Sequence, residues 1–140
     1  MELMLKPLRH YADFAGRARR KEFWSWFLFV WVLLFVLMYL DSVLGLGGSA
    51  SSYRNGNSVG FNMSGGVLTL LFALATLIPN LAVSVRRLHD SGKSGWLLLI
   101  ALIPLFGWAY LLFLYVQPGT AGPNEYGPDP KAGDPSTAFT

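Results

Sequence analysis

The chain has 140 residues, of which 53% are hydrophobic and only 14% are charged, and its net charge is +3. Its apolar residues lie in unbroken blocks, whereas a soluble domain shows them at helix or strand period. The composition therefore argues against an ordinary globular enzyme and predicts a membrane protein. The chain has no cysteine, which excludes disulfide bonds, thiolate metal sites and a cysteine nucleophile.

Residues 1–22 form a basic segment ahead of the first apolar block. Apolar side chains recur at helical spacing between residues 8 and 18, which predicts an amphipathic helix at the membrane surface. The basic side chains at its end are Arg17, Arg19, Arg20 and Lys21. Each would gain about 1 kcal/mol near an anionic leaflet. These four are candidate lipid or partner contacts, and a role in topology alone would also explain them. The cluster is short and juxtamembrane, so we expect no nucleic-acid partner.

Three stretches lack any acidic, basic or histidine residue: 23–40, 67–85 and 96–116. A bilayer core of about 30 Å needs about 20 helical residues, so each stretch is predicted to cross once. The expected fold class is all-α, an integral membrane bundle of three transmembrane helices within residues 23–116. The first block begins only after 22 residues, which favours an uncleaved helix over a signal peptide.

The second apolar stretch contains Pro79 and Asn80. Proline removes a helical hydrogen bond and favours a kink, which frees backbone carbonyls. Asn80, with Thr76 nearby, could line a polar path in an oligomer, or could simply hydrogen-bond a neighbouring helix.

Two segments outside the apolar stretches are rich in Gly, Ser, Asn or Pro. Residues 41–66 are predicted to form a mobile loop. Residues 117–140 hold five of the eight prolines and four glycines, which predicts an extended or disordered tail.

The distribution of basic residues predicts the orientation. Nine of the 11 lie in residues 1–22 and in the connection 86–95, against two in the connection 41–66 and the tail. By the positive-inside rule the N-terminus is expected to be cytoplasmic. With three spans, the tail is expected outside.

The connection after the second stretch begins with Arg86, Arg87, Leu88, His89 and Asp90. Arginines at a helix C-terminus complement its dipole, and they could also grip lipid phosphates. We therefore count Arg86, Arg87, His89 and Asp90 as candidate lipid or partner contacts. Asp90 is expected to pair with an arginine of residues 17–20, because both lie at the same predicted interface.

The same connection does not make a convincing catalytic or nucleotide site. A phosphate-binding loop would need glycine five positions before Gly92, and Arg87 stands there. His89 and Asp90 are adjacent on a helix, so they point in different directions. The chain has only two histidines and no metal-ligand spacing. We expect no catalytic, cofactor or metal residues.

Three motifs in order resemble those of the small bacterial inner-membrane proteins called domain-of-unknown-function family eight-oh-five. They lie at residues 14–24, 79–96 and 118–130, and the resemblance covers most of residues 11–130. It implies a multi-pass inner-membrane location and a helical architecture, with no established activity, substrate or cofactor. Leu97 departs from the second tryptophan expected there.

The tail motif is too specific for a segment that makes no contacts with the rest of the protein. If it docks on the Arg-Arg-Leu-His-Asp turn, both must lie on one side of the membrane, which three full spans forbid. A break at Pro79, or at Pro104 with Gly107, would then create a re-entrant element.

The leading hypothesis is a non-enzymatic scaffold or accessory subunit that binds anionic lipid or a larger membrane complex, and that forms a homo-oligomer or joins a partner membrane protein. The predicted spans lack ionisable residues, which ion and proton pathways normally need. The alternative is a small transporter or channel component acting as an oligomer. A third hypothesis is an enzyme acting on lipid headgroups, with His89 as its base.

Overall fold

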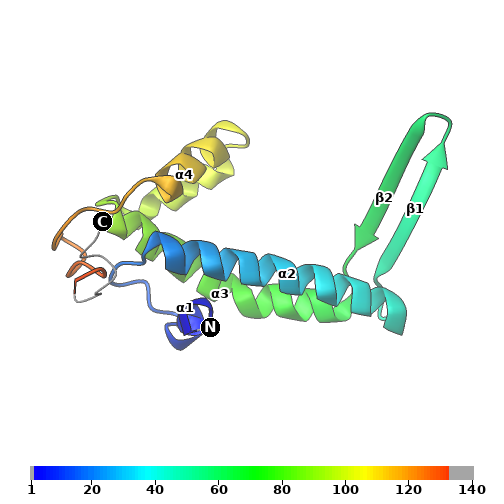
Figure 1. The fold of residues 1–140 in the computed structure, drawn as a ribbon, viewed down its shortest axis with the longest axis horizontal. Helices are drawn as coiled ribbons and strands as arrows, with labels where there is room; N and C mark the ends of the chain where they lie inside the picture. The colour runs from blue at the N-terminus through cyan, green and yellow to red at the C-terminus, as the bar shows by residue number, and fades with distance from the viewer. Residues whose placement is uncertain (1, 133–140) are drawn as a thin grey trace. The chain divides into compact units, whose positions relative to one another are not determined.

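The structure, a computed structural model, describes residues 2–132 (Figure 1). The elements in order are α1 (Glu2–Arg9), α2 (Arg20–Leu44), β1 (Ser49–Asn55), β2 (Ser58–Ser64), α3 (Val67–Asp90), the 3₁₀ helix η1 (Gly95–Leu102) and α4 (Phe106–Val116). The chain divides into two compact units: Met1–Trp26 with Pro79–Thr140, and Phe27–Ile78. The predicted tail residues 133–140 lie outside the described residues.

Helices α2 and α3 are long and apolar enough to cross a membrane. They have 25 and 24 residues, and their most apolar windows have mean hydropathies of 2.4 and 2.0. Only 11% and 22% of the residues in those windows are buried, whereas the core helix of a soluble protein is mostly covered. The first two predicted spans lie within these helices, and α3 continues without a break through Pro79.

The third predicted span is not one helix. The 3₁₀ helix η1 ends at Leu102, and α4 begins only at Phe106. Pro104 favours an extended Ile103 before it, and Ile103 has φ −90° and ψ 106°. Leu105 then takes a positive φ of 63°. The three-helix bundle is therefore not confirmed.

After this turn, α4 packs back against η1 as a helical hairpin. Gly107 lies so close to the carbonyl oxygen of Ile100 that no Cβ would fit there. The indole Nε1 of Trp108 donates to the carbonyl oxygen of Ala101 over 2.8 Å. With 11 residues, α4 is about 16 Å long, roughly half of what a bilayer core requires. The break expected at Pro104 and Gly107 is confirmed.

The predicted mobile loop contains an antiparallel hairpin of β1 and β2. Ser49 pairs with Ser64 at one end, and Asn55 pairs with Ser58 at the other. A two-residue turn needs positive φ, which Gly56 supplies at 59°. The fold is mostly helical, and the expectation of an all-α chain is wrong in this segment.

The N-terminal segment is less helical than predicted. Helix α1 ends at Arg9, and no described residue from Ala12 to Arg19 is helical. The Asp13 carboxylate accepts the backbone N–H of Ala15, which favours a turn over a helix at this point. Gly16 then takes a φ of 82°, so the expected amphipathic helix through residue 18 does not form.

A small hydrophobic core joins the C-terminal end of α3 to α4. It consists of Leu88, Leu111 and Leu114, with Leu97, Leu98, Ala101 and Tyr115 packed against it. This core fixes the η1–α4 hairpin against α3. It therefore brings the chain after α4 back to the charged end of α3.

Candidate functional site

The Asp90 carboxylate lies between two arginines. Arg17 Nε donates to its Oδ1 over 3.0 Å, and Arg87 Nη1 donates to its Oδ2 over 2.6 Å. The side chains of Arg17, Arg87 and Asp90 are 1%, 0% and 2% exposed. Burying charges is costly unless they are paired and hydrogen-bonded. The predicted pairing of Asp90 with the N-terminal arginines is confirmed for Arg17.

The remaining N–H groups of Arg17 and Arg87 bind the last turn of α4 and the start of the tail. Arg17 Nη1 donates to the carbonyl oxygen of Gly122 over 2.6 Å, and Arg17 Nη2 donates to that of Thr120. Arg87 Nε donates to the carbonyl oxygen of Tyr115 over 3.2 Å, and Arg87 Nη2 donates to that of Gln117. Arginine has five donors in a fixed fork. Here the forks satisfy backbone carbonyls that a proline-rich segment cannot pair in a helix or sheet.

The tail also contacts Asp90 directly. The backbone N–H of Thr120 donates to the carbonyl oxygen of Asp90 over 2.7 Å. Gly119 lies against the Asp90 carboxylate, where an added Cβ would clash. The proline- and glycine-rich composition thus permits a close backbone approach at this point.

A second carboxylate organises the tail further along. Asp129 Oδ2 accepts the backbone N–H of Gly122 over 3.0 Å, and its Oδ1 accepts that of Lys131 over 2.9 Å. The N–H groups of Lys131 and Gly122 hold the pKa of Asp129 below its usual range. Arg19 Nε donates to the carbonyl oxygen of Pro130 over 2.6 Å. Of the predicted extended or disordered tail, the disordered alternative is therefore wrong for residues 117–132, which form neither a helix nor a strand.

These contacts also bear on the predicted topology. The carbonyl oxygens of Thr120, Gly122 and Pro130 accept hydrogen bonds from Arg17 and Arg19, because the η1–α4 hairpin returns the chain to the end of α3. The sides of the membrane on which the N-terminus and the tail lie stay predictions.

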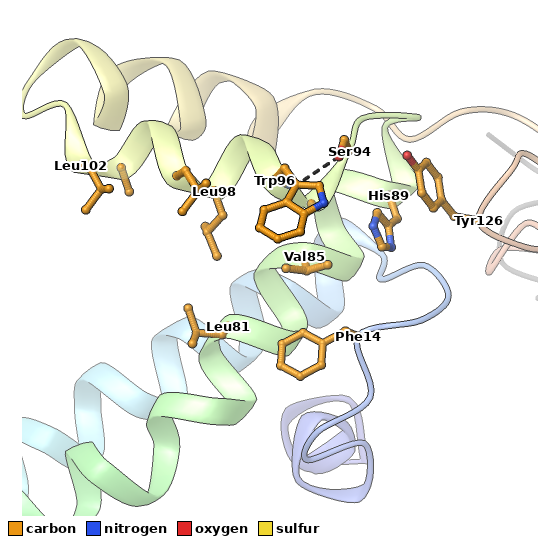
Figure 2. A pocket seen from close by; sticks show the side chains of 12 residues that line it. Phe14, Leu81, Val85, His89, Ser94, Trp96, Leu98, Leu102 and Tyr126 are labelled. Carbon is orange, nitrogen blue, oxygen red and sulfur yellow. Dashed lines mark hydrogen bonds between the residues drawn. The ribbon is translucent and has the colours of Figure 1, made fainter.

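His89 lies beside Tyr126 (Figure 2), and its side chain contacts groups other than Asp90. Its Nδ1 lies 3.2 Å from the carbonyl oxygen of Gly16. Its ring stacks on Tyr126, with centroids 4.0 Å apart and planes 3° from parallel. Asn124 Nδ2 donates to its backbone carbonyl oxygen over 2.9 Å. His89 and Asp90 therefore do not form an acid-base pair.

Arg86 belongs to a separate buried group around Glu22. Arg86 Nη1 donates to Glu22 Oε1 over 3.2 Å, and Lys6 Nζ lies 3.1 Å from Glu22 Oε2. The backbone N–H of Ala18 donates to the carbonyl oxygen of Arg86 over 3.0 Å. Sequence reasoning missed Glu22. Its position as the acid immediately before the first apolar block was the available signal, because such a carboxylate needs a cation.

The other predicted residues are dispersed. Arg20 and Lys21 are exposed, and Arg20 Nη1 lies 3.3 Å from the carbonyl oxygen of Val116. Asn80 Oδ1 accepts the indole N–H of Trp26 over 2.7 Å, which confirms the simpler of its two predicted roles. Pro79 is buried. Within residues 2–132, no group of three or more His, Cys, Asp or Glu side chains could hold a metal ion.

Two long apolar helices with a buried ionic cluster define a small helical membrane protein. The chain belongs to the family described as "Protein of unknown function (DUF805)", which matches residues 11–128. It is similar to the inner membrane protein YhaH of Escherichia coli strain K12, with 40% identity over 94% of this chain and 98% of the relative. The inner membrane protein YhaI of the same strain is 37% identical over 95% and 98%.

A more distant relative is the uncharacterized protein YiiR of Escherichia coli strain K12, which is 30% identical over 84% of this chain and 85% of its own. No solved structure matches the chain. The names of YhaH and YhaI support an inner-membrane location, and they state no activity.

Proposed function

We propose that the chain is a non-enzymatic inner-membrane scaffold that crosses the bilayer twice and presents a rigid basic face to anionic lipid and a partner membrane protein. The single observation that carries this proposal is the Asp90 cluster. Its two arginines join three segments distant in sequence: the N-terminal segment, the end of α3 and the tail. The buried charges of Arg17, Arg87 and Asp90 thus support a role in assembly.

Two spans account for the charge distribution better than three. With α2 and α3 as the spans, the N-terminal segment and the tail lie on one side. Of the 11 basic residues, only Arg54 then lies in the connection on the other side. The positive-inside rule makes the side with the other ten cytoplasmic. The short η1–α4 hairpin would enter the bilayer from that side without crossing it.

Exposed lysines offer the contact with lipid or partner. Lys21 begins the apolar part of α2, and Lys93 follows α3, and both are exposed. A juxtamembrane cation gains about 1 kcal/mol at an anionic surface. By contrast, Arg17, Arg86 and Arg87 are buried and donate to groups of this chain. The lipid contacts are therefore proposed at Lys21, which is one of the predicted contact residues, and at Lys93, which is not.

The transporter alternative receives less support. Asn80 is taken by Trp26, and the Thr76 hydroxyl donates to the carbonyl oxygen of Phe72 over 2.8 Å. Polar groups satisfied within the protein do not offer a path to an ion.

Photocrosslinking in intact cells tests the proposal. A photoreactive residue would replace Lys21 or Lys93, with a replacement at Arg54, exposed on β1, as the control. We expect positions 21 and 93 to give adducts with phosphatidylglycerol and with one protein of defined mass, and position 54 to give neither. Equal adducts at position 54, or no protein adduct at positions 21 and 93, would reject the scaffold role.

A further inference from the structure

An apolar pocket of about 820 Å³ lies beside the charged end of α3 (Figure 2). Ligand pockets usually measure about 300 to 1,000 Å³, so this one has room for a small ligand. Its lining comes mostly from α3 and η1, with Phe14 from the N-terminal segment and Tyr126 from the tail. The pocket therefore combines segments that are far apart in the sequence.

The polarity of the lining changes along the pocket. Leu81 lies two helical turns before His89 on α3, and Leu102 lies at the far end of η1 from Ser94. The apolar end thus lies toward the spanning part of α3, and the polar end lies at its charged terminus. This gradient matches a lipid whose acyl chain runs toward the bilayer core and whose head lies at the interface.

His89 offers an acceptor to this pocket. Its Nδ1 lies 3.2 Å from the carbonyl oxygen of Gly16, and a carbonyl oxygen can only accept. Nδ1 must therefore carry the proton, and in the neutral imidazole Nε2 is then an acceptor. A Cβ placed on Gly95, a lining residue, would lie 3.3 Å from Nε2. The acceptor therefore lies at the pocket wall.

Ser94 offers the complementary donor. Its Oγ accepts the backbone N–H of Trp96 over 3.3 Å, which leaves its own hydroxyl hydrogen available to donate. A ligand hydroxyl can donate to His89 Nε2, whereas a ketone or ester oxygen only accepts and could use only the Ser94 hydroxyl.

We propose that this pocket binds the acyl chain of a membrane lipid whose head carries a free hydroxyl group, with that hydroxyl donating to His89 Nε2. The rim supports a ligand from the bilayer, because Trp96 and Leu102 are each 80% exposed. Exposed apolar residues at the mouth of a pocket mark a place where an apolar partner enters. The inference requires the membrane location and is independent of the scaffold role.

Native mass spectrometry of the full chain in detergent tests this site. The probes are 1-monooleoylglycerol, which has free hydroxyls, and methyl oleate, which has the same chain and none. We expect one saturable 1-monooleoylglycerol per chain and about two- to ten-fold weaker methyl oleate, since one net hydrogen bond separates them. Equal binding of the two probes would overturn the hydroxyl assignment, and non-saturable binding would overturn the site.

Two variants locate the binding. Leu99→Trp adds bulk to the lining, and Leu74→Trp makes the same change on α3 away from it; both leucines are 58% exposed. We expect at least ten-fold weaker binding for Leu99→Trp and no change for Leu74→Trp. Unchanged binding by Leu99→Trp, or equal losses in both variants, would overturn the location.

His89→Asn tests the hydroxyl contact without removing the tie to Gly16. The asparagine amide can still donate to the Gly16 carbonyl oxygen, whereas nothing replaces Nε2. We expect this variant to bind the two probes equally. A variant that still prefers 1-monooleoylglycerol would overturn the role of His89. Because the measurement uses the purified chain without a partner, it can fail while the scaffold role stands.

Discussion

Asp41 and Asp90 are both buried carboxylates near helix ends, and their negative charges are stabilised in different ways. Asp41, in the unit Phe27–Ile78, accepts the backbone N–H groups of Gly66, Leu68 and Thr69, each over 2.9 Å, and the Thr69 hydroxyl over 2.7 Å. Asp90, in the other unit, binds two guanidinium groups. One carboxylate caps the start of α3, and the other closes its end.

The two environments give the acids different roles. The first N–H groups of any helix lack intrahelical partners, so a cap such as Asp41 acts within a short stretch of structure. The cations around Asp90 come from α3 itself and from a segment 73 residues away, and they also bind the tail. Asp90 therefore controls the assembly of three segments, whereas Asp41 controls one helix start and its adjoining connection.

Replacing Asp90 is expected to have the largest effect. Asp90→Asn would leave Arg17 and Arg87 buried without their counter-charge, and breaking a buried ion pair in this way costs about 3–5 kcal/mol. We expect a lower thermal unfolding midpoint in detergent and faster trypsin cleavage after Lys131. Asp13→Asn is the control, because that carboxylate is exposed and bound to His10. Equal losses in the two variants would show that the cluster does not hold the tail.

Variants of Asp41 test whether a hydrogen-bond acceptor without a negative charge is enough to stabilise the start of α3. Asp41→Ala removes the cap and should lower the unfolding midpoint by about 3–6 °C, as for other lost N-caps. Asp41→Asn keeps one acceptor oxygen for Gly66 and Thr69 but turns an NH2 group toward the Leu68 N–H, so its midpoint should lie between those of Asp41→Ala and the wild type. At position 90, by contrast, asparagine should not restore stability. An Asp41→Asn variant as unstable as Asp41→Ala would mean that charge matters equally at both sites.

The sequence predicted the features that depend on neighbouring residues. The long apolar blocks located the first two spans, because about 20 apolar residues in a row are a local property. The pairing of Asp90 with Arg17 was also predictable, because opposite charges that lie at the same predicted interface attract each other. The caps and pairs of Asp41 and Glu22 were missed, because single acids beside apolar blocks give only a weak signal.

The remaining errors concern contacts between distant residues. The segment 96–116 satisfies every length and hydropathy criterion for a span, and only Pro104 and Gly107 mark its turn. The tail has a disordered composition, yet its carbonyls are satisfied by arginines about 100 residues earlier in the chain. Composition cannot report a hydrogen-bond partner supplied from elsewhere in the fold.

Asp129 extends the comparison to a partly exposed carboxylate that, like Asp41, is held by backbone N–H groups. These groups, on Lys131 and Gly122, lower the pKa of Asp129 from its usual value of about 4. The carboxylate therefore stabilises the docked tail above pH 4, and this contribution is lost as the pH falls through the lowered pKa. Docking should be constant between pH 7 and pH 5 and should weaken below pH 4.

The amide chemical shifts of Gly122 and Lys131, followed by NMR in detergent, measure this titration locally. We expect both amides to titrate together with a midpoint below 4, because they share one carboxylate. Asp129→Asn should remove this titration and raise trypsin cleavage after Lys131 at pH 7, by less than Asp90→Asn does. A midpoint at or above 4 would mean that the amides do not favour the charged form. The tail would then depend on the arginines of the Asp90 cluster alone.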